Sequence, residues 1–151
     1  MVRLCVASAF LTLLGAIAAP AASAQSRDCR EADLEGVWEL VSIRAAEPGV
    51  EAFYRQAPVE YMRFGPGGDY IYVARTAKLG SLAEINASLD RTDAVDGMTY
   101  VGQFVDSGVL VIFRDGQPFQ GFTCGMRADG AMVWTEFPGN PDLERVHRRV
   151  R

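Results

Sequence analysis

The chain has 151 residues and a formal net charge of −4 at pH 7, from 15 basic and 19 acidic side chains. This mild negative charge disfavours nucleic acid as a partner, because phosphate binding depends on clustered lysine and arginine. One histidine and three cysteines give too few ligands at short spacing for a zinc site, and the sequence contains no Gly-rich phosphate motif, so we expect neither a metal nor a cofactor.

The first 24 residues are typical of a secretory signal peptide. Arg3 supplies the early positive charge, residues 4–18 form an apolar run, and small residues precede Gln25. The apolar run is short for a membrane span, and no second span follows. We predict cleavage near Ala24, residues 25–35 as an N-terminal segment and residues 36–151 as one domain. The mature protein is expected to be secreted or periplasmic, with no membrane span.

Two cysteines remain after cleavage, Cys29 and Cys124. An even number of cysteines in an exported chain favours a disulfide. Closing so long a loop stabilises a fold by up to about 4–5 kcal/mol in the chain-entropy description. The bridge is expected to tie the N-terminal segment to a late strand.

Turn signals divide the mature chain into short segments rich in β-branched and aromatic residues. The pairs Asp115-Gly116 and Asp129-Gly130, for example, are typical of tight hairpins. This spacing favours an antiparallel meander over βαβ units, and closure into a barrel would protect its edges. The eight predicted strands are 36–44, 58–64, 69–76, 98–105, 108–114, 118–126, 131–137 and 143–150.

One helix interrupts this pattern. Ser81 and Glu84 have the spacing of a capping box, and apolar residues follow at helical intervals, so we predict a helix over 82–90. Residues 91–97 are predicted to form a mobile loop, and residues 45–57 a second loop.

The tripeptide Gly36-Val37-Trp38 opens the first predicted strand. It resembles the Gly-x-Trp signature of lipocalins and of the shorter bacterial lipocalin-like domains. The resemblance implies an all-β fold, an eight-stranded antiparallel up-and-down barrel with one short helix. It also implies that Trp38 closes the barrel floor and that a basic side chain of the last strand, Arg145 or Arg148, lies over its ring.

Residues for catalysis or metal binding are few. His147 stands between arginines on the last strand without a nucleophile motif, and it is expected to be an ordinary exposed histidine. Asp90, Asp93 and Asp96 recur every third residue but lack the glycine and glutamate of a calcium loop. We predict no catalytic residue and no metal ligand.

Aromatic residues on the predicted strands are the remaining candidates for a site. Inside a barrel, phenols and rings would give an apolar pocket with a few polar anchors, as small-molecule sites have. Alternatively, the same rings fill a solid barrel. The candidate ligand-binding residues are Trp38, Tyr61, Tyr72, Tyr100, Phe104 and Trp134.

Three functions fit these features. The leading hypothesis is non-catalytic binding of a small apolar or aromatic molecule inside the barrel. The second is a barrel that binds an envelope protein, such as a periplasmic protease inhibitor, through the N-terminal segment or loops carrying Phe53 and Tyr54. The third is an enzyme with an acid–base pair at the barrel mouth, such as Asp69 or Glu136 with a tyrosine. Oligomeric state has no signal in the sequence.

Overall fold

The computed structural model describes residues 26–137 and 142–151. The predicted signal peptide, residues 1–24, and residues 138–141 lie outside the described residues. No helix in the described part is long and apolar enough to cross a membrane.

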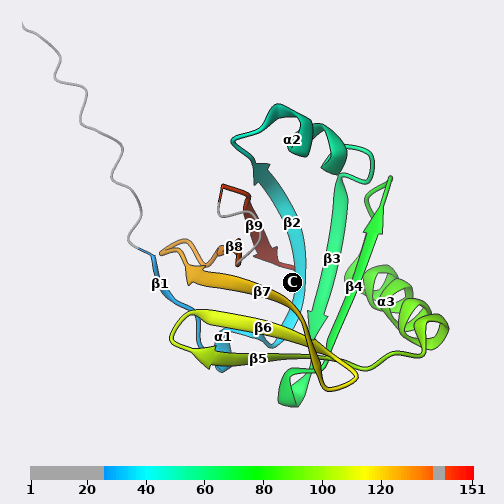
Figure 1. Cartoon of the computed structure of the whole chain (residues 1–151). Helices are drawn as coiled ribbons and strands as arrows, with labels where there is room; N and C mark the ends of the chain where they lie inside the picture. The colour runs from blue at the N-terminus through cyan, green and yellow to red at the C-terminus, as the bar shows by residue number, and fades with distance from the viewer. Residues whose placement is uncertain (1–25, 138–141) are drawn as a thin grey trace, which may run out of the picture.

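A single antiparallel sheet dominates the fold (Figure 1). Eight strands follow the order β4-β3-β2-β9-β8-β7-β6-β5, and the short β1 pairs with β7. This order confirms the predicted meander, and each of the eight predicted segments contains a strand whose ends agree within two residues. The strands are β1 (Arg27–Asp28), β2 (Gly36–Arg44), β3 (Val59–Phe64), β4 (Tyr70–Arg75), β5 (Tyr100–Asp106), β6 (Val109–Arg114), β7 (Gln117–Met126), β8 (Met132–Phe137) and β9 (Glu144–Arg149).

The sheet curls into a half-barrel whose end strands are β4 and β5. In the described chain these two strands meet at a single bridge, between Asp69 and Val101. The 3-10 turn η1 (Pro66–Gly68) brings Gly68 against the β5 backbone, and a Cβ on Gly68 would lie 2.4 Å from the carbonyl oxygen of Gly102. Glycine is therefore required where the two end strands approach one another.

The two predicted loops, residues 45–57 and 91–97, both contain helical residues, so these predictions were wrong. The helix expected over 82–90 extends further, because α3 (Leu82–Asp96) includes most of the predicted loop 91–97 and ends at Gly97 in the left-handed conformation. The second loop contains α2 (Pro48–Tyr54), which begins with a proline at its first turn. At the start of α3, Ser81 accepts from the Glu84 amide as predicted, whereas the Glu84 side chain accepts from the Gly80 amide.

Alternation along the strands creates two apolar clusters. The larger one fills the inside of the half-barrel around Trp38 and Trp134. The smaller lies on the outer face of β3 and β4, where α3 packs Ile85 and Leu89 over Tyr61. The two clusters show which aromatic residues point into the half-barrel and which point outward. Alternation along a strand separates its two faces but does not say which one is the inner face.

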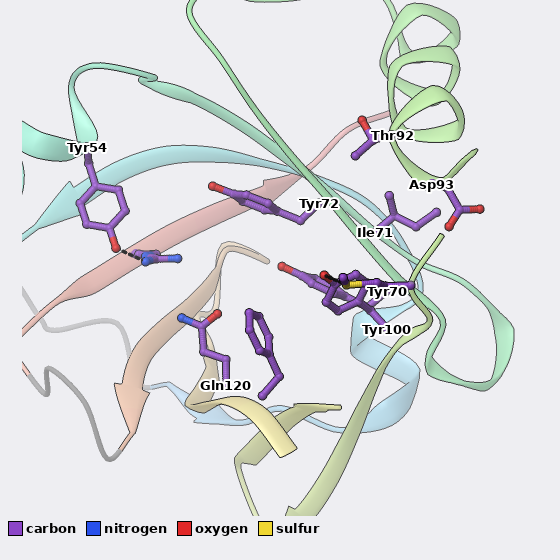
Figure 2. Close-up of a pocket in the computed structure, with 11 residues that line it drawn as sticks. Tyr54, Tyr70, Ile71, Tyr72, Thr92, Asp93, Tyr100 and Gln120 are labelled. Atoms are coloured by element: carbon purple, nitrogen blue, oxygen red, sulfur yellow. Dashed lines mark hydrogen bonds between the residues drawn. The ribbon is translucent and has the colours of Figure 1, made fainter. Parts of the chain in front are cut away.

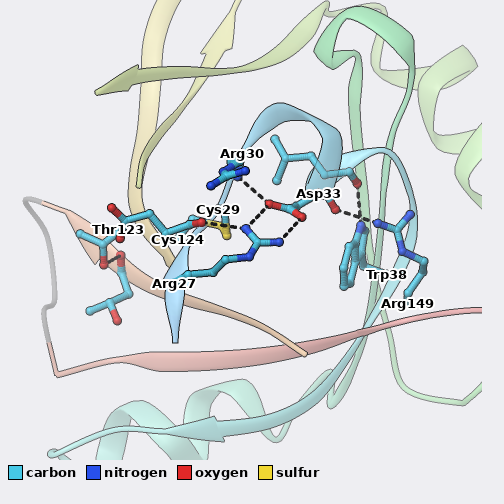
Figure 3. Close-up of a disulfide and its surroundings, with 11 residues drawn as sticks. Arg27, Cys29, Arg30, Asp33, Trp38, Thr123, Cys124 and Arg149 are labelled. Carbon is cyan, nitrogen blue, oxygen red and sulfur yellow. Dashed lines mark hydrogen bonds and ion pairs between the residues drawn. A yellow bond between two sulfur atoms is a disulfide. The ribbon is translucent and has the colours of Figure 1, made fainter. Parts of the chain in front are cut away.

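A disulfide joins Cys29 to Cys124, as predicted (Figure 3). The two Cα atoms are 5.4 Å apart, and the Cys29 amide donates to the Cys124 carbonyl at 3.0 Å. The bridge fixes β1 and the following α1 (Glu31–Leu34) to β7. This link is compatible with an oxidising, extracellular location.

Candidate ligand-binding pocket

A cavity of about 360 Å³ is lined by residues of the half-barrel and by two residues of α3 (Figure 2). In this view Tyr54 lies at one end, and Thr92 and Asp93 of α3 lie at the other. Four tyrosines from three different elements contribute to its wall. The lining residues are Tyr54, Tyr70, Ile71, Tyr72, Thr92, Asp93, Met98, Tyr100, Phe119, Gln120 and Arg145.

Strand alternation explains the tyrosines of β4. Tyr70 packs against the inner apolar cluster, whereas Ile71 and Val73 pack against the outer cluster beneath α3. Tyr72 is two residues from Tyr70 and so shares the inner face. A strand with phenols on one face and aliphatic residues on the other gives the cavity a wall that is apolar and carries hydroxyl groups.

The opposite wall comes from β5 and β7. Tyr100 and Phe119 make an edge-to-face pair with ring centroids 5.9 Å apart, and the Arg114 guanidinium covers Phe119 at 4.5 Å. Phe119 is half exposed, at 51 %. The cavity therefore has an aromatic rim that is accessible from solvent.

Arg145 of β9 brings a positive charge into the cavity. Its guanidinium donates to the Tyr54 hydroxyl and lies over the Tyr54 ring, 4.7 Å from the centroid. The Nε atom of Arg145 is buried and has no hydrogen-bond partner among the described residues. Arg145 is thus held by Tyr54 of α2, while part of its hydrogen-bonding capacity is unused.

A buried carboxyl group lies close to this arginine. Glu60 of β3 is only 3 % exposed, and its Oε2 atom lacks a partner in the described structure. Burial raises the pKa of Glu60, while the charge of Arg145 and hydrogen bonding with Tyr72 lower it in part. Glu60 and Arg145 do not form an ion pair. The ion pairs of the described residues all involve other side chains.

The phenols of Tyr70 and Tyr72 stay protonated at neutral pH. Burial raises the pKa of both Tyr70 and Tyr72, and the nearby Glu60 charge raises that of Tyr72 further. A protonated phenol both donates and accepts a hydrogen bond. These hydroxyls can therefore anchor polar groups of a ligand without adding charge to the wall.

His147 is buried, so the prediction of an exposed histidine was wrong. It is 3 % exposed and packs against Trp134 with the ring centroids 5.1 Å apart. Desolvation by burial, with a smaller effect of Arg145, lowers the pKa of His147 to about 3. His147 shares the inner face of β9 with Arg145, so the alternation of this strand places it beneath the cavity as a neutral ring.

Trp38 belongs to the inner apolar cluster and is fully buried. Its indole Nε1 donates to the Leu34 carbonyl at 2.7 Å. The basic side chain over its ring is Arg149, whereas Arg145 reaches the cavity and the exposed Arg148 pairs with Asp129. The role predicted for Arg145 or Arg148 therefore moves to Arg149, which is the residue paired with Trp38 across β2 and β9.

The six predicted ligand residues occupy different places. Tyr72 and Tyr100 line the cavity. Tyr61 lies on the outer face of β3, where α3 covers it and its hydroxyl accepts from the Leu79 amide at 3.0 Å. Trp38 and Trp134 belong to the inner apolar cluster, and Phe104 packs against it. Within the cluster the ring centroids of Trp134 and Phe122 are 4.5 Å apart.

The carboxylates considered for acid–base chemistry are not among the residues that line this cavity. Asp69 stands at the bridge between β4 and β5, and Glu136 accepts from Gln120 at 2.9 Å. Asp90 pairs with Arg63 at 2.7 Å on the exposed side of α3. Among the described side chains no group of three His, Cys, Asp or Glu residues could hold a metal ion.

Sequence reasoning missed Tyr54, Phe119 and the inward position of Arg145. The sequence predicts a loop around Tyr54, since the helix that carries it is short and contains a proline and a glycine. Arg145 lies two residues from His147 on the same strand face, but this alternation predicts an inward position only once the burial of His147 is known.

The chain was compared with protein-family models, with curated proteins and with solved structures, and none of the three comparisons finds a match. The half-barrel and its tyrosine-lined cavity are therefore the basis for any functional argument.

Proposed function

We propose that this protein is an exported lipocalin-like binder that holds a small apolar or aromatic molecule, without catalysis, in the cavity between β4, β5 and β7. The lipocalin-like assignment is supported by the strand order and by the Gly-x-Trp floor with an arginine over the indole. In this proposal the eight strands form a complete barrel, in which β4 and β5 lie side by side and close the gap between them.

The observation that carries the proposal is the composition of the cavity wall. Four tyrosines and Phe119 surround about 360 Å³, within the usual size range of small-molecule sites. Tyrosine side chains bury large apolar areas and carry hydroxyl groups that can fix the orientation of a ligand. A cavity used only for packing would have no need of so many polar tips.

A neutral aromatic probe tests this proposal. N-phenyl-1-naphthylamine becomes fluorescent when it enters an apolar site, and it should bind the mature protein with a stoichiometry of one. Thr92→Trp places an indole at the cavity wall and should abolish binding. The probe is excited directly, beyond the absorption of indole, so that the added tryptophan does not contribute to the signal.

Arg91→Trp is the matched control, because Arg91 is exposed on the same helix and does not line the cavity. This variant should bind the probe as the wild type does. Failure of the wild type to bind, or equal binding by both variants, would contradict the proposal.

A further inference from the structure

We propose that the natural ligand is an anion, an apolar or aromatic molecule whose acidic group pairs with Arg145. This inference rests on the proposed binding function and specifies the chemistry of the ligand. Among the described residues that line the cavity, Arg145 is the one with a positive charge.

The charge of Arg145 lacks a close counter-ion. Its guanidinium bonds to the hydroxyl group of Tyr54, and no described carboxylate lies within ion-pair distance of it. A charge withdrawn from water costs free energy unless it is paired and hydrogen-bonded. An acidic group of a ligand would supply this missing partner.

Glu60 does not remove the need for such a partner. Its carboxyl group is buried beside the cavity wall, and burial favours its neutral form. Glu60 also lies outside the set of residues that line the cavity, whereas Arg145 belongs to it. A ligand therefore meets the arginine and not the carboxylate.

The hydroxyl groups around Arg145 favour the same charge. Tyr54 accepts a hydrogen bond from Arg145, so its own proton remains available for donation. The Tyr72 hydroxyl lies near both Arg145 and Glu60. An arginine beside the phenolic donor of Tyr54 is suited to the oxygen atoms of a carboxylate, sulfonate or phosphate.

The opposite end of the cavity explains why one anionic group, and not two, is expected. Asp93 lies there on α3, exposed at the rim. A second negative group placed near Asp93 would be repelled. The ligand is thus expected to be amphipathic, with its acid near Tyr54 and its apolar body along Tyr70 and Tyr100 (Figure 2). Phe119 would extend the apolar contact at the rim.

Two probes with the same aromatic skeleton test this inference. 8-anilinonaphthalene-1-sulfonate carries a sulfonate, and N-phenyl-1-naphthylamine does not. The wild type should bind the sulfonate about tenfold or more tightly, as expected for a charge-assisted hydrogen bond. Arg145→Gln should abolish this preference, so that the two probes bind with similar affinity.

Three further variants separate charge from folding. Arg145→Lys keeps the charge and should retain part of the preference, while Arg148→Gln on the same strand, outside the cavity, should retain all of it. Glu60→Gln removes the carboxyl group and should retain the whole preference for the sulfonate, because Glu60 does not line the cavity. Near-ultraviolet circular dichroism verifies that each variant is folded.

The outcomes distinguish the two proposals. If neither probe binds, the binding function itself fails. If the neutral probe binds at the cavity and the sulfonate binds equally well or more weakly, the anion assignment is overturned while the binding function stands. Unchanged preference in folded Arg145→Gln would likewise overturn the assignment.

Discussion

The guanidinium carbon of Arg149 lies 4.5 Å from the centroid of the Trp38 ring (Figure 3). The same guanidinium donates to the carbonyl oxygens of Glu35 and Asp33, the second at 2.8 Å. Arg149 therefore joins the last strand to the segment that enters β2. The indole beneath it is anchored in turn by its bond to the Leu34 carbonyl.

Trp38→Ala should lower the free energy of unfolding by about 3–5 kcal/mol, because it removes a fully buried ring from the floor. Arg149→Ala should cost about 1 kcal/mol, through the lost contact with the indole and the lost bonds to carbonyls. Arg148→Ala is the matched control and should change stability very little, since Arg148 is exposed. Urea unfolding measures all three. Equal losses in Arg149→Ala and Arg148→Ala would contradict the role of Arg149.

The disulfide should stabilise the fold by limiting the unfolded chain. Replacing both Cys29 and Cys124 by serine is expected to cost about 2–4 kcal/mol and to lower the melting temperature. The lost restraint should also make the segment around α1 more sensitive to proteases, since the bridge fixes it to β7. Wild-type protein with reducing agent should behave as the double variant does. Free thiols in the oxidised wild-type protein would disprove the bridge.

Gly68 and Gly67 form a matched pair for the closure of the half-barrel. Both have positive φ, of 90° and 83°, so an alanine at either position pays a similar backbone cost of about 1 kcal/mol. A Cβ at Gly68 would also strike the Gly102 carbonyl, whereas a Cβ at Gly67 meets open space. Gly68→Ala should therefore be the more destabilising of the two in thermal unfolding. Equal losses would mean that η1 and β5 do not touch.

Stability should fall in acid because His147 is buried as a neutral ring. Its pKa is lowered to about 3 in the folded protein, so the unfolded chain binds the proton first as the pH falls below about 6.5. The contribution of His147 is present above that pH and is lost between about 6.5 and about 3. Where the unfolded chain binds one proton more than the folded protein, the free energy of unfolding falls by about 1.4 kcal/mol per pH unit.

His147→Leu should remove this part of the acid loss. Glu60 acts in the opposite direction, because its raised pKa makes the folded state bind a proton more readily, but it is common to both proteins. The difference between the two urea-unfolding curves measured against pH thus isolates His147. Parallel curves for wild type and variant would contradict the burial of an uncharged ring.

Much of the sheet could be predicted because local signals and the fold agree. Asp115-Gly116 forms a turn in which both residues have positive φ, and the flanking segments pair as β6 and β7. Where the signal was weak, tertiary contacts decided. The end of α3 carries aspartates that suggested a loop, yet Thr92 bonds back to the Ser88 carbonyl and Gly97 ends the helix.

The pocket was harder to predict than the strands. Which aromatic faces point inward depends on where α3 packs, and its contact with Tyr61 involves residues distant in sequence. The charge of the pocket was missed for a similar reason. An arginine on a terminal strand is usually exposed, and only the fold shows that Arg145 meets Tyr54, which is 91 residues away.

Native mass spectrometry of protein exported by a host and purified gently tests the central claim most directly. The account predicts a species heavier than the polypeptide, by the mass of one small molecule that is lost on denaturation. The same preparation of Thr92→Trp should lack this mass, whereas Arg91→Trp should carry it. A wild-type protein that shows only its polypeptide mass, and that binds neither naphthalene probe, would contradict the account.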